Sequence, residues 1–151
     1  IVVCAGAKSI LDIPNTLEYL ETQGVTVIGY QTDTFPAFFT RSSGVNVPFR
    51  IDSATEIARI AQAQWNLGLN NSILVGNPIP AEHELADIQA EEAIKLAVKE
   101  AEESGISGSK LTPFLLSRVS SLTESASLLA NLTLLKNNAK LAAEISKQLL
   151  I

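Results

Sequence analysis

The chain has 151 residues, 46% of them apolar, which predicts a single domain with a sizeable core. A formal net charge of −5 argues against nucleic acid as a scaffold partner, because binding phosphates over a large surface needs clustered Lys and Arg. No apolar run reaches membrane-spanning length, no secretory leader is present, and one cysteine cannot form an internal disulfide, so we expect a soluble, cytoplasmic protein.

The first twelve residues predict a strand, a turn and the start of a helix. Residues 1–4 are typical of a strand buried on both faces, Cys4 being a small buried hydrophobe, and Gly6 permits the turn. Lys8 therefore lies in a strand-to-helix turn, the place where ligands bind in open α/β sheets. Burial beside a helix N-terminus lowers the pKa of an amine, as nucleophilic lysine chemistry requires. A solvated surface charge is the alternative that position alone leaves open.

The next segments complete a β-α-β unit. Asp12 is suited to cap a helix that ends at Gly24, because apolar residues recur between them at helical spacing. Residues 25–30 are then expected to form a second buried strand, and the crossover between the two strands should be right-handed.

An aromatic-rich loop, residues 31–44, follows this second strand. Its composition is typical of a ligand-facing loop, while anchoring to the core or to another subunit is the alternative for Phe35, Phe38 and Phe39. Its polar side chains suit a sugar or a phosphate but are also ordinary loop residues: Thr32, Asp33, Arg41, Ser42 and Ser43.

The middle of the chain predicts an edge strand, a helix and another buried strand. Pro48 confines residues 45–51 to a sheet edge, and residues 72–76 form the buried strand. The helix between them is expected to start at Asp52 or Ser53 and to end near Gly68. Its Trp65 suits a packing anchor at the interface of helix and sheet.

Asn77 comes directly after the third buried strand, in a loop that Pro78 and Pro80 stiffen. An amide there both donates and accepts, which suits a uracil edge or a sugar hydroxyl, and a turn-forming Asn is the alternative. His83, the only histidine, has no second His or Cys near it. We therefore interpret it as a solvated residue at a helix start rather than as a zinc ligand.

Three helices are expected in the remainder. Residues 87–104 form a solvated amphipathic helix, Thr112 caps the next with Pro113 at its first position, and the last runs from about Ser125. Asn131 stands beside the apolar stripe of the last helix. A buried amide must be hydrogen-bonded, so Asn131 is either tied to backbone or faces a ligand.

Six segments of the chain resemble the motifs of a known family: Val-Cys-Ala-Gly-Ala-Lys-Ser-Ile-Leu-Asp, Thr-Leu-Glu-Tyr-Leu-Glu-Thr-Gln-Gly-Val, Gly-Tyr-Gln-Thr-Asp-x-Phe-Pro-Ala-Phe, Asn-Pro-Ile-Pro, Thr-Pro-Phe-Leu-Leu and Asn-Asn-Ala-x-Leu-Ala. In this order they resemble pseudouridine-5'-phosphate glycosidase, the family also called indigoidine synthase A-like. The resemblance covers essentially all of residues 1–151 and assigns them to the C-terminal part of a single domain, so we expect an N-terminal half upstream.

The resemblance implies a three-layer α/β/α fold with a mostly parallel or mixed sheet, and a homotrimeric enzyme of the lyase class. Its reaction is reversible cleavage of pseudouridine 5'-phosphate to uracil and ribose 5-phosphate. Lys8 matches the nucleophile that bonds to C1' of ring-opened ribose, and Asn131 matches a substrate-site asparagine. Asn77 and Thr32 are further candidates for substrate binding. The family's divalent metal, usually Mn²⁺, has its ligands upstream, so we expect no metal ligand here and no activity from this chain alone.

Two other functions remain open on the sequence. A Schiff-base lyase that acts on another sugar phosphate would keep Lys8 and differ in the loops around Thr32 and Asn77. A non-enzymatic α/β binding or assembly module would need no lysine chemistry.

Overall fold

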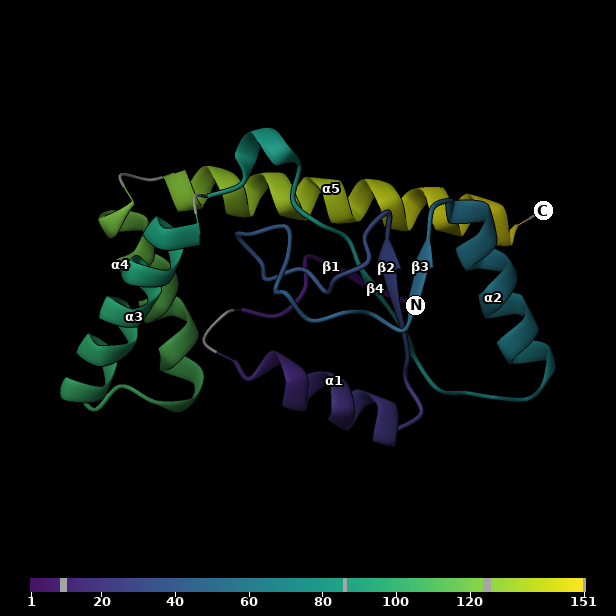
Figure 1. The fold of residues 1–151 in the computed structure, drawn as a ribbon, viewed down its shortest axis with the longest axis horizontal. Coiled ribbons are helices and arrows are strands. Elements are labelled where there is room, and N and C mark those ends of the chain that lie inside the picture. The colour runs from purple at the N-terminus through teal and green to yellow at the C-terminus, as the bar shows by residue number, and fades with distance from the viewer. Residues whose placement is uncertain (9–10, 86, 124–125, 151) are drawn as a thin grey trace.

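The computed structural model describes residues 1–8, 11–85, 87–123 and 126–150, which form the elements labelled in Figure 1. In chain order these are β1 (Val2–Cys4), α1 (Ile13–Thr22), β2 (Thr26–Tyr30), β3 (Phe49–Ile51), α2 (Ala54–Asn66), β4 (Ile73–Gly76), a 3₁₀ turn (Ala81–His83), α3 (Asp87–Glu103), a second 3₁₀ turn (Gly108–Lys110), α4 (Leu111–Leu122) and α5 (Ala126–Leu149).

The four strands form one sheet in the order β1-β4-β2-β3, and every neighbouring pair is parallel. Val75 of β4 is in register with Val3 on one side and with Ile28 on the other. Since all four strands run the same way, the loops that follow them leave from one edge of the sheet, which we call the carboxyl edge.

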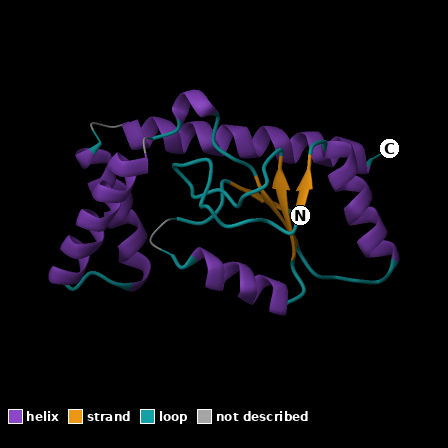
Figure 2. Ribbon diagram, in the orientation of Figure 1, coloured by secondary structure: helices purple, strands orange, loops and turns teal. Residues whose placement is uncertain are grey.

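Helices cover both faces of the sheet, which lies between α1 and α5 in Figures 1 and 2. On one face Ile28, Ile73 and Val75 pack against side chains of α2 and α5. On the other face Val27 packs with Ile13 of α1. A parallel sheet requires apolar cover on both faces, and the predicted three-layer α/β/α architecture is confirmed.

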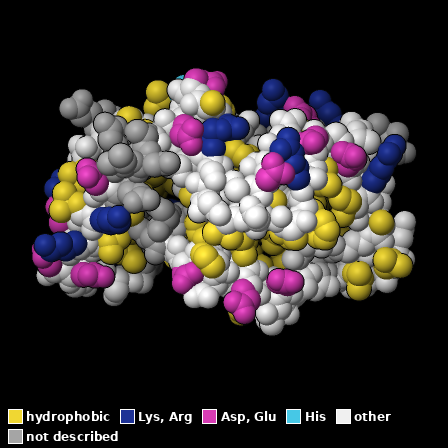
Figure 3. All heavy atoms as spheres, in the orientation of Figure 1, with side chains coloured by type: hydrophobic (Ala, Val, Ile, Leu, Met, Phe, Trp, Pro, Cys, Tyr) yellow, Lys and Arg dark blue, Asp and Glu magenta, His cyan; other side chains and the backbone are white. Residues whose placement is uncertain are grey.

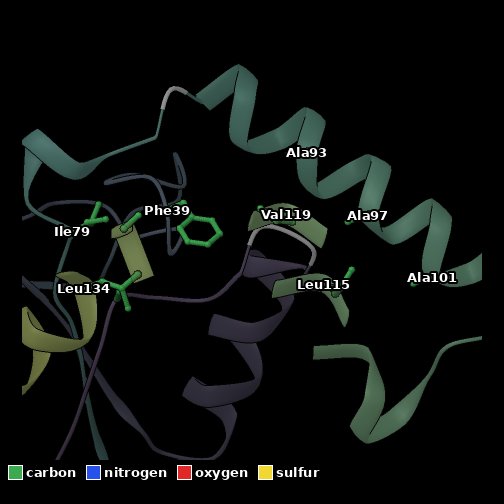
Figure 4. Close-up of a cluster of buried hydrophobic side chains, with 10 residues drawn as sticks. Phe39, Ile79, Ala93, Ala97, Ala101, Leu115, Val119 and Leu134 are labelled. Atoms are coloured by element: carbon green, nitrogen blue, oxygen red, sulfur yellow. The ribbon is translucent and has the colours of Figure 1, made fainter. Parts of the chain in front are cut away.

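Helices α3 and α4 form a pair beyond the carboxyl edge, at the left of Figure 1. Figure 4 shows Ala93, Ala97 and Ala101 spaced along α3, with Leu115 and Val119 on α4. All five side chains are buried in one cluster, which the first half of α5 also joins. Small residues at this spacing let the two helices approach closely.

Most predicted boundaries hold, and three predictions are wrong. The opening strand is not buried on both faces, because β1 is an outer strand of the sheet and Val2 is 53% exposed. The Asp12 side chain caps α1 by accepting a hydrogen bond from the Asn15 amide at 3.0 Å, and β3 is an edge strand. However, α4 begins at Leu111 after a 3₁₀ turn, so Thr112 lies inside the helix instead of capping it. Ser125 lies outside the described residues.

Trp65 is not the buried packing anchor that the sequence suggested. It is 46% exposed at the end of α2 and lies beside a surface hollow formed with residues of β1 and α5. The helix instead buries Ile57, Ala58 and Ala61, which are almost fully enclosed. Within the described ranges, none of the helices combines the length and apolar character needed to cross a bilayer.

Candidate functional site

The carboxyl edge brings together loops that are far apart in the sequence. The Asn77 amide after β4 donates to the Cys4 carbonyl at the end of β1 at 2.7 Å. The Phe38 amide in the loop after β2 donates to the Ala5 carbonyl at 3.0 Å. The turn that carries Lys8 is therefore hydrogen-bonded to the loops that follow β4 and β2.

Two glycines allow these loops to meet without a side chain between them. Gly6 has φ +88°, and a Cβ on it would lie 1.7 Å from the Pro36 carbonyl oxygen. A Cβ on Gly76 would lie 2.8 Å from Cδ of the same proline. Pro36 is almost completely buried in the space that the two glycines leave. The close approach explains why no larger residue fits at Gly6.

Lys8 lies at the mouth of an apolar hollow. Its amine is 5.8 Å from the centroid of the Phe38 ring, and burial lowers the pKa of Lys8 below its ordinary value. The other lining side chains are all apolar: Phe38, Phe39, Ile94, Leu115, Leu116 and Val119. The strand-to-helix turn thus places the Lys8 amine, whose pKa is lowered, beside apolar side chains that offer it few hydrogen-bonding groups.

Two phenylalanines of the aromatic loop anchor it to the core, and the third lines the hollow. Phe35 and Phe39 are buried anchors, 2% and 5% exposed. Phe38 has φ +69°, a conformation rare for a bulky residue, and its ring lines the hollow beside Lys8. The ring packs edge-on against Phe39, with the two centroids 4.7 Å apart.

The polar residues of this loop have protein partners, some within the loop and some beyond it. The Thr32 hydroxyl donates to the Thr34 carbonyl at 3.0 Å and accepts from its amide at 3.2 Å. Arg41 donates from its guanidinium to the Ile79 carbonyl at 2.5 Å, and Asp33 pairs with Arg50 at 2.7 Å. Substrate binding by Thr32 stays a prediction, since its hydroxyl has local partners here.

The loop that follows β4 is hydrogen-bonded to α5. Asn77 is only 4% exposed, and its Nδ2 donates to Oδ1 of Asn138 at 3.1 Å. Asn137 donates from Nδ2 to the Pro78 carbonyl at 3.1 Å. Neither Asn137 nor Asn138 was among the predicted site residues. A signal was present, because both stand where the apolar stripe between Leu134 and Leu141 should continue.

Asn131 lies on the same helix, half-buried and seven residues before Asn138. Seven residues are close to two helical turns, so the two amides share a face of α5 about 10 Å apart along its axis. Its neighbours Ala130 and Leu134 belong to the buried cluster of α3 and α4. No hydrogen bond within the described part of the chain joins Asn131 to Lys8.

The site has no evident place for manganese. Across the ranges that the structure describes, no three His, Cys, Asp or Glu side chains are grouped so as to hold a metal ion. Burial raises the pKa of the Cys4 thiol, which favours the protonated form over the thiolate that binds metals. On the face shown in Figure 3, basic and acidic side chains are interspersed, without a single basic patch.

Comparison with known proteins gives one consistent match. The model of the family described as indigoidine synthase A like protein matches residues 1–148. The pseudouridine-5'-phosphate glycosidase of Geobacillus kaustophilus is 55% identical over 148 residues, which cover 98% of this chain and 49% of that protein. The enzyme of the same name from Legionella pneumophila is 56% identical over 145 residues, which cover 96% of this chain and 46% of that protein.

Two solved structures are also similar. The prealnumycin C-glycosynthase in complex with ribulose 5-phosphate has a TM-score of 0.84 at 36% identity, covering 96% of this chain and 48% of that one. An indigoidine synthase A-like protein from Thermotoga maritima has a TM-score of 0.83 at 39% identity, covering 95% and 47%. The chain therefore spans about half the length of the relatives it matches.

Proposed function

The chain belongs to the indigoidine synthase A-like family, and on this premise we propose that it supplies the nucleophile of a pseudouridine-5'-phosphate glycosidase. The reaction is the reversible cleavage of pseudouridine 5'-phosphate to uracil and ribose 5-phosphate. The observation that carries the proposal is the Lys8 amine, with its lowered pKa, at the carboxyl edge of a parallel sheet.

The bond to be broken explains why an amine is needed. In an N- or O-glycoside the leaving group departs on a heteroatom, helped by carboxylates, whereas this base is joined to the sugar through carbon. In the proposed first step, the neutral Lys8 nitrogen bonds to C1' as the C1'–O4' bond breaks and O4' takes up a proton. The nitrogen then loses a proton, which leaves a secondary amine on an open-chain sugar.

The second step separates the base from the sugar. The nitrogen lone pair forms a C=N bond to C1' while the C1'–C5 bond breaks, and its electron pair goes to C5 of uracil, which takes up a proton. Water then adds to the imine, releases ribose 5-phosphate as an aldehyde and restores the Lys8 amine. The sum is one water consumed for each pseudouridine 5'-phosphate cleaved.

The surroundings of Lys8 favour this chemistry. Because burial lowers the pKa of Lys8, its neutral, nucleophilic form is more populated at a given pH than that of a solvated lysine. The apolar lining of the hollow disfavours the charged ammonium form of Lys8, because it offers that charge little solvation. In this proposal Asn131, on the adjoining part of α5, contacts the substrate.

The rest of the site belongs to the other half of the enzyme. Family resemblance assigns a manganese ion, a proton-transferring carboxylate, cationic phosphate contacts and trimer formation to the complete protein, and the described residues here offer no metal-binding cluster. We expect the 151-residue chain alone to show no turnover. In the experiments below, "full-length enzyme" means this chain preceded by the half that its relatives carry.

A second candidate is transfer of a sugar phosphate to or from a different carbon acceptor. It is favoured by the similarity to the C-glycosynthase solved with ribulose 5-phosphate, at 36% identity. In this candidate Lys8 keeps its proposed role and the acceptor differs. Competition between uracil and other aromatic acceptors, with ribose 5-phosphate held constant, separates the two candidates.

Borohydride trapping tests the proposal directly. The full-length enzyme is incubated with pseudouridine 5'-phosphate, reduced, digested and analysed by mass spectrometry, with Lys136→Arg on the exposed surface of α5 as the matched control. We expect a reduced pentose-phosphate adduct on Lys8, retained in the control and lost in Lys8→Arg. Turnover of pseudouridine 5'-phosphate without any adduct on Lys8 would overturn the proposal.

A further inference from the structure

The inward side of α5 has a polar interruption between two apolar clusters. Ala130 and Leu134 pack with α3 and α4, whereas Leu141 and Ile145 pack with the sheet and α2. Asn137 and Asn138 occupy the turn between the two sets. A helix that only needed to bury its inner face would carry an apolar residue there.

Both amides have specific partners in the loop after β4. The side-chain oxygen Oδ1 of Asn138 accepts a hydrogen bond from Nδ2 of buried Asn77 at 3.1 Å. The side-chain Nδ2 of Asn137 donates to the Pro78 backbone carbonyl, also at 3.1 Å. The same loop is fixed from its other side, because Arg41 donates to the Ile79 carbonyl. The loop is thus held between α5 and the aromatic loop.

Directional hydrogen bonds define the position of a helix more sharply than apolar packing does. Sliding α5 along its axis by one helical turn, about 5.4 Å, would still bury many of its alanines and leucines. It would, however, break the side-chain hydrogen bonds of both Asn137 and Asn138. It would also leave Asn77 buried without a partner, which costs about 1–3 kcal/mol. The amide pair therefore selects one register of α5 against the sheet.

This register bears directly on the site. The backbone N–H of Asn77 donates to the Cys4 carbonyl, four residues before Lys8, and Asn138 shares a helix face with Asn131. A continuous path therefore runs from the Lys8 turn through Cys4, Asn77 and Asn138 to Asn131.

We propose that Asn77 and Asn138 are a positioning pair that sets the placement of Asn131 relative to Lys8, rather than residues that contact the substrate. The proposal rests on the function assigned above to those two residues. It gives Asn77 a different role from the substrate contact that the sequence suggested, in keeping with its burial. A displacement of about 1 Å in such a site costs up to a hundredfold in rate.

The test compares kinetics with stability in the full-length enzyme. We expect Asn138→Ala and Asn77→Ala each to lower kcat/KM by about tenfold or more, and the double variant to be no worse than either, because the two residues act through one bond. Asn138→Asp keeps an oxygen acceptor for Asn77 and should restore most of the activity. Asn138→Ser, too short to reach Asn77, replaces the alanine variant if that variant folds poorly.

The same helix provides a matched control. Near the end of α5, Gln148 accepts a hydrogen bond from Thr55 of α2, also at 3.1 Å, far along the helix from the carboxyl edge. Gln148→Ala removes a comparable polar tie and should lower Tm, yet kcat/KM should stay within about twofold of the wild type.

Two results would overturn the positioning role. One is an equal loss of kcat/KM in Asn138→Ala and Gln148→Ala at matched Tm, and the other is additive losses in the double variant. Failure of the proposed function looks different, because the wild-type enzyme itself would then form no adduct on Lys8.

Discussion

The carboxyl edge of the sheet and the α2–α5 face of the same sheet are built in different ways. At the carboxyl edge, Gly6, Gln31 and Phe38 all have positive φ, and loops touch backbone to backbone. On the α2–α5 face, Ile57 and Val75 are fully enclosed by aliphatic neighbours between regular elements. One region is held by exact fit and directed hydrogen bonds, and the other by apolar burial.

The difference predicts different consequences of substitution. Apolar burial contributes to folding in proportion to area and says little about where individual atoms lie. Positive φ values and close backbone approach cost free energy, and such strain is characteristic of sites where geometry matters. Changes at the carboxyl edge should therefore affect catalysis at least as much as stability, whereas changes on the α2–α5 face should affect stability alone.

The largest difference between loss of activity and loss of stability is expected for Lys8→Ala. Removing the proposed nucleophile should lower kcat of the full-length enzyme by about a thousandfold or more. Since the side chain is only partly buried, Tm should change little. Steady-state kinetics and thermal unfolding of the same preparation measure both. Residual activity within tenfold of the wild type would show that another group attacks the sugar.

Gly6→Ala should destabilise the packing of loops at the carboxyl edge. The added methyl group would overlap the Pro36 carbonyl, so we expect a loss of more than about 3 kcal/mol in the free energy of unfolding. Gly68→Ala is the control, because Gly68 has a similar φ of +75° with nothing within 4 Å of the new Cβ. That variant should lose only about 1–2 kcal/mol. Denaturant titration that gave equal losses would mean that the Pro36 contact yields easily.

Ile57→Ala tests the other region. Ile57 is fully buried between α2 and the sheet, so truncation should cost about 2–5 kcal/mol in the free energy of unfolding. The kcat/KM of the folded enzyme should remain within about twofold. Leu67→Ala, at a side chain that is 76% exposed, should change stability by less than about 0.5 kcal/mol. A selective loss of kcat/KM in Ile57→Ala would undo the distinction between the two regions.

The lowered pKa of Lys8 predicts how activity and stability depend on pH. Its pKa is lowered by burial, and the neutral amine is the nucleophile, so kcat/KM should rise with pH and level off below the range of an ordinary lysine. Because the folded state binds its proton less tightly than the unfolded state, this group makes stability rise with pH between the two pKa values. The rate of borohydride trapping as a function of pH reports the first effect. The same rise in the residual activity of Lys8→Ala would assign it to another group.

The smallest effect is expected on the α3–α4 pair. Arg118 forms a bidentate ion pair with Glu100, and this hydrogen bonding lowers the pKa of the Glu100 carboxyl. The stabilisation is therefore complete above the unfolded-state pKa of a glutamate and is lost as pH falls through the lower folded-state pKa. Glu100→Gln should lower Tm by about 1–2 °C at pH 7 and by less near pH 3. An undiminished difference at acidic pH would contradict the ion-pair explanation.

The scaffold was predictable because its elements follow simple periodicities. Short apolar runs and a helical repeat predicted the β-α-β unit, Pro48 predicted the edge strand, and Asp12 was recognised as a helix cap by its residue type. Trp65 was misplaced because Ile57, Ala58 and Ala61 took the buried face of α2, a rotation about the helix axis that a tryptophan near the end of a helix does not reveal. The start of α4 was misplaced because the second 3₁₀ turn runs directly into it.

The site was predictable only in part, for a physical reason. The position of Lys8 follows from local sequence, since a strand, a glycine and a helix cap surround it. The pairing of Asn77 with Asn138 joins residues 61 positions apart, and the positive φ of Phe38 opposes the intrinsic preference of that residue. Both are imposed by tertiary packing, so the sequence shows at most that Asn138 interrupts an apolar stripe and does not show which residue it pairs with.

The contact of Gly6 with Pro36 has a consequence for how this site can change during evolution. Two loops that interlock through their main chains cannot lengthen independently, because an insertion in either would push the other away from its strand. New substrates would then be accommodated by exchanging individual side chains around a rigid rim, or by changes in the partner half, and insertions between residues 5 and 8 or 35 and 38 should be selected against.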